Sequence, residues 1–242
     1  MKSDFDRRRW LALAGSTLVG VVATGPALRA ADKEGKDEDT EMEVPAAEDL
    51  MREHGILRRA LLVYSETASR LSHGNGAVPL EELGRTAALF RNFGEDYHER
   101  SLEEKHVFPP LIKAGGEHGS LARTLTSQHD RGREITAYIE AVAKKGSLAK
   151  ADSPQLATTL LSFVRMYEHH VAIEDTIVFP AWKKAISPAQ YHELTEQFED
   201  LEHKMFGKDG FEDGLKRIAA IERAFGLADL AALTAPPPPK LA

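Results

Sequence analysis

Residues 153–180 read SPQLATTLLSFVRMYEHHVAIEDTIVFP, and the spacing of their large side chains decides the fold. Steps of alternately four and three residues, the spacing of one buried α-helical face, connect seven of these side chains: Leu156, Leu160, Phe163, Tyr167, His170, Glu174 and Ile177. A histidine and a glutamate thus share the buried face with apolar side chains, and burying either is costly unless something pairs with it. The stretch therefore predicts a buried helix with a binding site inside it.

The end of this stretch has a near copy earlier in the chain. Residues 174–180 read EDTIVFP, and residues 103–109 read EEKHVFP. Each copy follows a histidine about one helical turn upstream, and a further histidine precedes each of these by more than forty residues. The repeated order of two histidines and a glutamate suits a pair of cations, because a carboxylate can bridge two ions while each histidine binds one. The histidines of this pattern are His54, His98, His129 and the adjacent His169 and His170, and its carboxylates are the pairs Glu103-Glu104 and Glu174-Asp175.

Helical patterns cover most of the remaining chain, and strand-like alternation is missing. Four long helices are expected over residues 46–72, 79–108, 119–144 and 153–177, with short connections. His54 and His129 fall on the inward faces of the first and third. This predicts an all-α fold, an up-down-up-down four-helix bundle over residues 46–183. Two further helices, near 187–204 and 211–225, are expected to pack outside the bundle as an extension over residues 184–234.

One spacing departs from a regular helix. His98 and Glu103 are five residues apart, which would turn their side chains about 140° away from each other. A π-bulge between them would restore a common face, and such bulges gather at functional sites. In the alternative, Glu99 pairs with Glu103 and His98 lies behind the ligands. Further candidates for alternate or outer positions are His169, Tyr97 and Tyr167.

Composition excludes several classes of protein. The formal net charge is -7, and no basic stripe lies outside the first ten residues, so nucleic acid is not expected as a partner. The chain has no cysteine, which excludes disulfides, cysteine-ligated iron–sulfur clusters and zinc–thiolate sites. Any metal must be held by nitrogen and oxygen, which suits iron or manganese, with zinc as a further possibility.

The two ends of the chain differ in composition from its middle. Residues 1–31 resemble a twin-arginine export signal: Arg7-Arg8-Arg9-Trp10-Leu11 precedes a stretch of apolar character that ends near Ala23. That stretch is shorter than the roughly 20 residues of a membrane span. An ordinary secretory signal or an uncleaved anchor is the alternative. A periplasmic or cell-envelope location is expected, with a disordered charged linker over 32–45 and a disordered proline-rich tail over 235–242.

The motifs between residues 46 and 183 resemble those of the hemerythrin-like (HHE) cation-binding family. The resemblance rests on the Glu-His-Gly at His54, the Gln-His-Asp at His129 and the two Phe-Pro copies. It implies a four-helix bundle that holds two iron ions with an oxo or hydroxo bridge. The ligands that it implies are His54, His98, Glu103, His129, His170 and Glu174. One departure concerns Arg133, which stands one turn after His129 where oxygen-carrying hemerythrins have a fifth histidine. Simple oxygen transport is therefore not the expected role.

Three functions follow from this reading. The first is an exported di-iron protein that binds or senses oxygen or nitric oxide, or handles iron, with a small diatomic ligand and an unidentified redox partner. The second is a di-iron oxidase or peroxidase-like enzyme. The third is a structural helical bundle that binds zinc. No flavin or nucleotide motif is visible, so a self-sufficient reductase is not expected, and a metal-binding protein is favoured over an enzyme.

Overall fold

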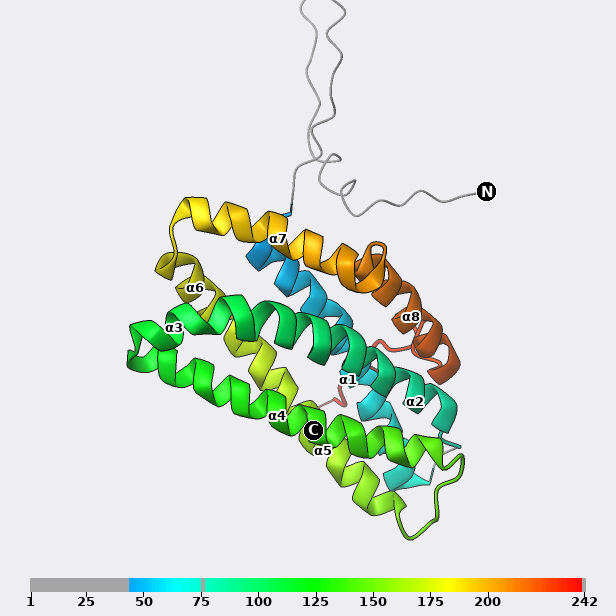
Figure 1. Ribbon diagram of the computed structural model, residues 1–242. Coiled ribbons are helices and arrows are strands. Elements are labelled where there is room, and N and C mark those ends of the chain that lie inside the picture. The colour runs from blue at the N-terminus through cyan, green and yellow to red at the C-terminus, as the bar shows by residue number, and fades with distance from the viewer. Residues whose placement is uncertain (1–43, 75–76, 241–242) are drawn as a thin grey trace, which may run out of the picture. The chain divides into compact units, whose positions relative to one another are not determined.

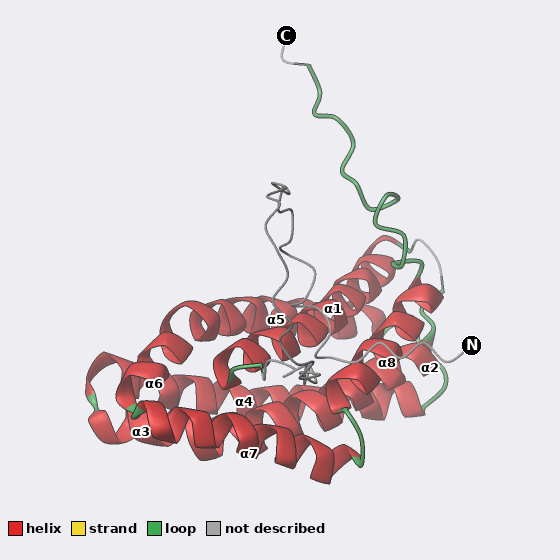
Figure 2. Cartoon of the chain, turned by 90° about the horizontal axis from the view of Figure 1, so that it is seen from above, coloured by secondary structure: helices red, strands yellow, loops and turns green. Residues whose placement is uncertain are grey.

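A computed structural model describes residues 44–74 and 77–240. The expected export signal over 1–31, and all but the end of the linker over 32–45, lie outside these described residues. Within them the chain is helical and contains no strand, as Figure 2 shows. None of the described helices is long and apolar enough to cross a membrane.

Four long helical rods form the bundle, in agreement with the predicted fold class (Figure 1). The first is α1 and the third is α4, whereas the second and fourth are each built from consecutive segments without an intervening loop. The bounds are α1 (Ala46–His73); α2 (Leu80–Leu89), η2 (Phe90–Val107) and α3 (Phe108–Ala114); α4 (Gly116–Lys144); and α5 (Ser153–Ile173), η3 (Glu174–Val178) and α6 (Phe179–Ala185).

The helix ends follow local sequence with two corrections. Gly74 ends α1 with a φ of 66°, and its N–H donates to the carbonyl of Arg70, as the glycine at this position predicts. The expected stop at Phe108 is wrong, because Pro109 lies in the first turn of α3, where no N–H is needed. The start of α5 at Ser153 is as expected, whereas α4 begins at Gly116 rather than at residue 119.

The second and fourth rods both contain π-helical turns beside the predicted ligands. In η2 the N–H of Phe108 donates to the carbonyl of Glu103, five residues earlier. This confirms the π-bulge predicted between His98 and Glu103. The π-helical segment extends beyond it, over Phe90–Val107. A second wide turn, in η3, was not predicted, and there Phe179 donates to Glu174. It moves the buried face by one residue, so Ile177 is 39% exposed rather than buried as expected, and Val178 is buried instead.

The extension consists of α7 (Pro188–Phe206) and α8 (Gly210–Phe225), which lie over α1 and the second rod. Side chains of α7 complete the start of α1, since Pro45 offers no capping side chain. Thr195 Oγ1 accepts a hydrogen bond from the N–H of Ala46 at 3.1 Å, and Tyr191 Oη accepts one from Ala47 at 3.0 Å. These bonds satisfy two N–H groups that a helix start leaves without partners.

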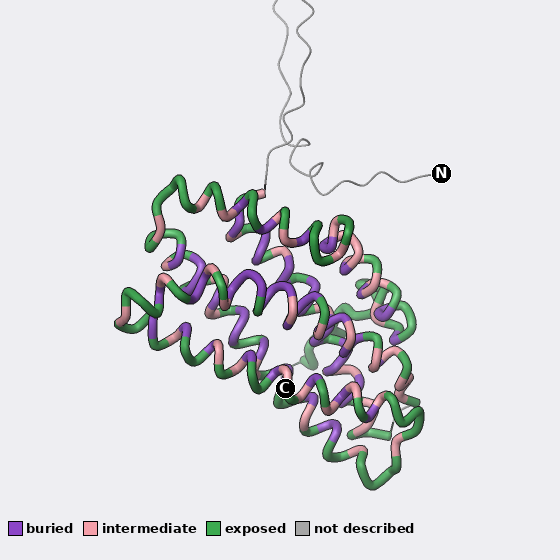
Figure 3. Tube along the Cα trace, in the orientation of Figure 1, coloured by how far each residue is buried: buried purple, intermediate pink, exposed green. Residues whose placement is uncertain are grey.

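Buried residues line the inner faces of all four rods, and exposed residues follow their outer faces (Figure 3). An aromatic cluster fills one part of this core, with Phe90 and Phe163 in edge contact at 5.0 Å between ring centroids. Tyr167 joins the cluster through Phe90 at 4.9 Å. Beside this apolar packing the core also buries several histidines and glutamates, and these form the candidate site.

Candidate metal centre

Four histidines meet inside the bundle in two pairs. The Nε2 atoms of His54 on α1 and His98 on η2 are 2.9 Å apart. Those of His129 on α4 and His170 on α5 are 3.1 Å apart. All four rings are at most 2% exposed. Two ligand nitrogens on one cation, each about 2.1 Å from it and at right angles, would be separated by roughly 3 Å.

Two glutamates stand between the pairs, and each directs one oxygen toward each pair. Glu174 Oε2 is 3.4 Å from His54 Nε2, and its Oε1 is 3.0 Å from His170 Nε2. Glu103 Oε1 is 3.4 Å from His98 Nε2, and its Oε2 is 3.4 Å from His129 Nε2. This is the arrangement expected of carboxylates that bridge two cations.

The chemistry of these atoms fits a pair of bound cations. Both carboxylates are fully buried, and none of their four oxygens has a hydrogen-bond partner among the described residues. A buried carboxylate without hydrogen bonds is strongly unfavourable unless a cation compensates it. Imidazole nitrogens and carboxylate oxygens are ligands for iron, manganese and zinc. The residues present could therefore hold two such ions.

Four polar side chains, none of them a predicted metal ligand, orient the imidazoles through their Nδ1 atoms. Metal-binding histidines generally donate this second N–H to a carboxylate or carbonyl, which fixes the ring and raises its basicity. Three of the acceptors here are carboxylates and one is an amide. The contacts are His54 with Asp175 at 2.7 Å, His98 with Glu53 at 2.7 Å, His129 with Glu104 at 3.0 Å, and His170 with Gln128 at 2.9 Å.

These contacts repeat in the two halves of the chain. The residue after each bridging glutamate orients the first histidine of the other half of the chain. Asp175, which follows Glu174, contacts His54, and Glu104, which follows Glu103, contacts His129. The phenylalanine of each Phe-Pro copy stacks on the same ring. Phe179 lies 5.5 Å from His54, and Phe108 lies 5.5 Å from His129. The duplicated motif in the sequence thus corresponds to a duplicated half-site.

The carboxylates shift the pKa values of the imidazoles. Burial alone would lower the pKa of His129, but Glu99 and Glu104 raise it to about 9. Burial also opposes protonation of His98, yet Glu103 and Glu53 hold its pKa well above the usual value. The site therefore attracts positive charge, which a metal cation supplies in place of protons.

The other candidate residues lie outside the four imidazoles and two bridging carboxylates. Glu99 accepts a hydrogen bond from Tyr167 at 2.8 Å and one from Arg133 at 3.2 Å, and its Oε2 is 4.0 Å from His129 Nδ1. Tyr97 packs its ring against aromatic side chains, with Phe206 of α7 at 5.3 Å.

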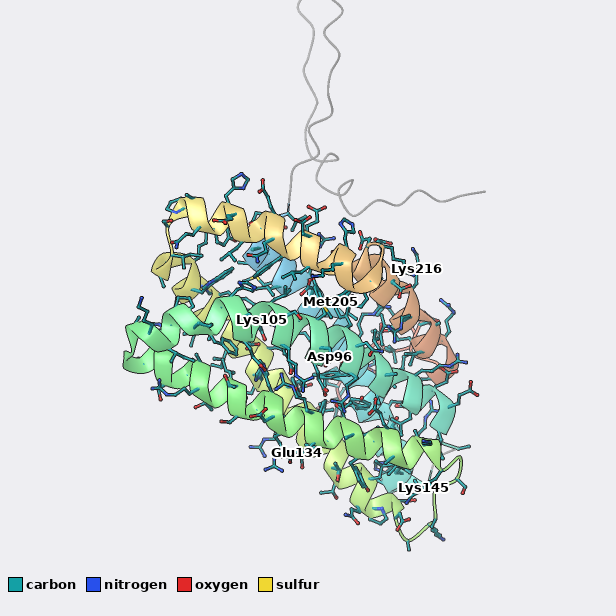
Figure 4. All side chains as sticks on the ribbon, viewed as in Figure 1. Asp96, Lys105, Glu134, Lys145, Met205 and Lys216 are labelled. Atoms are coloured by element: carbon teal, nitrogen blue, oxygen red, sulfur yellow. The ribbon has the colours of Figure 1, made fainter. Side chains whose placement is uncertain are left out.

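His169 points away from the site and is exposed on α5. Other charged residues follow the outer faces of the rods, as Figure 4 shows for Glu134 on α4. Only some of the acidic groups and histidines of the described residues therefore lie inside the bundle.

Sequence reasoning missed the residues that orient the imidazoles. Glu53, Glu104, Gln128 and Asp175 each adjoin a predicted ligand in the chain, so their positions were visible. Their roles depend on how different helices meet, because each acts on a histidine of another element. Adjacency to a ligand inside a duplicated motif was the signal that could have found them.

Comparison with known proteins agrees with this geometry. The family model of the hemerythrin HHE cation binding domain matches residues 46–182. Uncharacterized proteins of Mycobacterium tuberculosis and Mycobacterium bovis are 39% identical over 235 residues, covering 94% of this chain and 90% of theirs. No solved structure matches the chain. The chain belongs to the hemerythrin HHE cation-binding domain family.

Proposed function

We propose that this protein is a non-haem di-iron protein that binds or senses a small diatomic ligand, such as oxygen or nitric oxide, or handles iron itself. The observation that carries the proposal is the set of four buried oxygens of Glu103 and Glu174. Within the part of the chain that the structure describes, these oxygens have no hydrogen-bond partner, and they face two histidine pairs. Two cations would satisfy all four oxygens at once.

The donor set favours iron over a structural zinc ion. Structural zinc sites are closed and tetrahedral, and they commonly use thiolates, which this chain lacks. Each cation here would take two imidazole nitrogens and an oxygen from each bridging carboxylate. Two histidines with carboxylate ligands and open positions are typical of non-haem iron centres that bind small molecules. Manganese and zinc remain alternative outcomes of the metal analysis.

The residue that follows His129 by one turn supports a role other than simple oxygen transport. Arg133 occupies that position and forms ion pairs with Glu99 and Glu104, so it adds no ligand to the neighbouring cation. The buried Tyr167, whose hydroxyl donates to Glu99, lies beside His170 at 5.3 Å between ring centroids. This tyrosine is the specific feature that favours the second candidate, an oxidase or peroxidase-like activity.

Metal analysis tests the proposal directly. The protein is loaded anaerobically with ferrous iron, desalted, and examined for metal content and for near-ultraviolet charge-transfer absorption after exposure to air. Two irons per chain and a spectrum that responds to nitric oxide support the proposal. One zinc per chain, or no retained iron, contradicts it. Turnover of hydrogen peroxide would favour the enzymatic alternative.

We also propose that the protein is exported in a folded state. Arg7-Arg8 and the apolar stretch that follows them support export by the twin-arginine route to the periplasm or cell envelope. Substitution of both arginines by lysine should keep the protein in the cytoplasm, as measured by cell fractionation with an immunoblot. Unchanged export of the double variant would contradict the twin-arginine route.

A further inference from the structure

The two histidine pairs are related by the duplication, but the groups that orient them differ. The residue before the first histidine of each half orients the second histidine of that half: Glu53 acts on His98, and Gln128 acts on His170. Glu53 is fully buried, whereas Gln128 is partly exposed. A carboxylate thus stands in one half where a neutral amide stands in the other.

This difference changes how strongly each imidazole donates to a cation. A carboxylate that accepts the Nδ1–H raises the basicity of Nε2 and strengthens the bond to metal, more than a neutral amide does. His98 therefore has the stronger support, and His170 the weaker. The distances are similar, 2.7 Å and 2.9 Å, so charge rather than reach distinguishes them.

The other two orienting groups are both carboxylates, and each is paired with an arginine. Asp175, which binds His54, is paired with Arg58, whose side chain is 49% exposed and therefore well screened by water. Glu104, which binds His129, is paired with Arg133, which is only 11% exposed. Arg133 also pairs with Glu99 and Asp130, so its charge is divided among three carboxylates.

Glu99 places another carboxylate near the second pair, with its Oε2 4.0 Å from His129 Nδ1. Both Arg133 and Tyr167 donate to Glu99, at 3.2 Å and 2.8 Å, so its charge is largely compensated. The contrast between Glu53 at His98 and Gln128 at His170 is therefore the difference that distinguishes the two pairs.

Access to the two pairs also differs. A surface groove of about 770 Å³ lies between α4 and α5, and Gln128 lines it together with Arg165 and His169. The amide that orients His170 thus reaches the surface. Glu53 lies on α1, which α7 and α8 cover. The groove thus reaches the group that orients His170 and none of the groups that orient the first pair.

We propose that the two cation positions are unequal: the position at His54 and His98 retains its ion, and the position at His129 and His170 exchanges its ion through the groove at Gln128. Glu53 and Gln128 set the difference. This inference rests on the proposed two-ion site and deepens it, because an exchangeable ion beside a retained one suits a protein that handles iron.

Chelation kinetics test the inference on the full chain loaded anaerobically with ferrous iron. An excess of a ferrous chromogenic chelator should remove the ions in two phases of one ion each. Glu53→Gln should accelerate the slow phase, and Gln128→Glu should slow the fast phase, each by roughly 10–100-fold, the usual effect of such orienting groups. Glu193→Gln and Gln155→Glu, at exposed positions, are the matched controls and should change neither phase.

The possible results separate this inference from the proposed function. Loss of both ions in a single phase, or variants that act on the opposite phases, would overturn the inference while leaving a two-ion site intact. Failure to load two ions would instead overturn the proposed function. If Glu53→Gln folds poorly by circular dichroism, Gln128→Glu decides the matter alone, and an unchanged fast phase in that variant would refute the proposal.

Discussion

Glu174 faces both histidine pairs, whereas His170 belongs to one of them, and this gives different expectations for metal content. His170→Ala should retain one of two ions, because His54 and His98 keep their own pair. Glu174→Ala should retain less, since both ions lose an oxygen. Atomic emission analysis after desalting measures the difference. His192→Ala, at a position 69% exposed, should leave the content unchanged. Equal content in all three variants would contradict the ligand assignment.

His129 makes the metal-free protein sensitive to alkaline pH. Its pKa is about 9 in the folded state, because Glu99 and Glu104 outweigh the effect of burial, and its ordinary value is 6.5. A raised pKa gives stability that is fully present below pH 6.5 and is lost as the pH rises through 9. The free energy of unfolding of the metal-free protein should therefore fall between these values, measured by urea denaturation. A flat or rising profile would contradict the expectation.

Glu104 makes the stability of the metal-free protein sensitive to acid pH. Burial opposes its ionisation, but His129 and Arg133 lower its pKa to about 2 from an ordinary 4.5. Its contribution to stability is thus complete above pH 4.5 and is lost as the pH falls toward 2. Metal-free protein should be most stable between these two windows. His129→Gln should flatten the alkaline part of the profile more than the acid part.

Among the elements, α4 and α5 approach closely at Gly132. A Cβ at this position would overlap Tyr167 Oη, so Gly132→Ala must displace the tyrosine from Glu99. Overpacking of this kind costs about 1–3 kcal/mol. A Cβ at Gly55 on α1 would meet no atom within 4 Å, and Gly55→Ala should stabilise by roughly 0.5–1 kcal/mol. Denaturation should show opposite signs, and equal signs would refute the close approach.

The start of α1 depends on α7. Thr195→Val removes the acceptor of the Ala46 N–H, and an unsatisfied buried N–H costs about 1–3 kcal/mol. Thr158→Val, at an exposed position of α5, should change the free energy of unfolding by no more than about 0.5 kcal/mol. Urea denaturation compares the two variants. Similar values would mean that α7 does not support this helix end.

The two π-helical turns mark how far sequence predicts the elements. The sequence predicts the turn before Phe108, because His98 and Glu103 are five residues apart and share a helix face only if the helix widens by one residue. It does not predict the turn before Phe179, since His170 and Glu174 already have regular helical spacing. Both turns precede a proline, whose ring would clash with the carbonyl four residues earlier in a regular helix. Proline position is thus the physical signal that could have predicted the second turn.

For the whole molecule, periodicity predicted the four rods and the inward positions of the histidines, because one buried face dominates each helix. The packing of α7 and α8 could not be predicted in the same way. It depends on long-range contacts such as the bond from Arg59 to Glu222 at 2.8 Å, which joins residues 163 positions apart. The orienting groups of the site share this limit, since they too act between elements.

Metal binding should stabilise the fold, because the four oxygens of Glu103 and Glu174 are buried and have no hydrogen-bond partner within residues 44–74 and 77–240. An ion that binds only the folded state at about 100 times its dissociation constant adds roughly 2.7 kcal/mol. For a domain of this size that corresponds to an increase in Tm of roughly 5–10 °C. Calorimetry before and after chelation should show this difference, and it should widen from pH 6.5 to 9, since imidazole protons no longer replace the ions there. Glu174→Ala should show a much smaller difference. An equal Tm with and without metal would mean that the buried carboxylates do not depend on a cation.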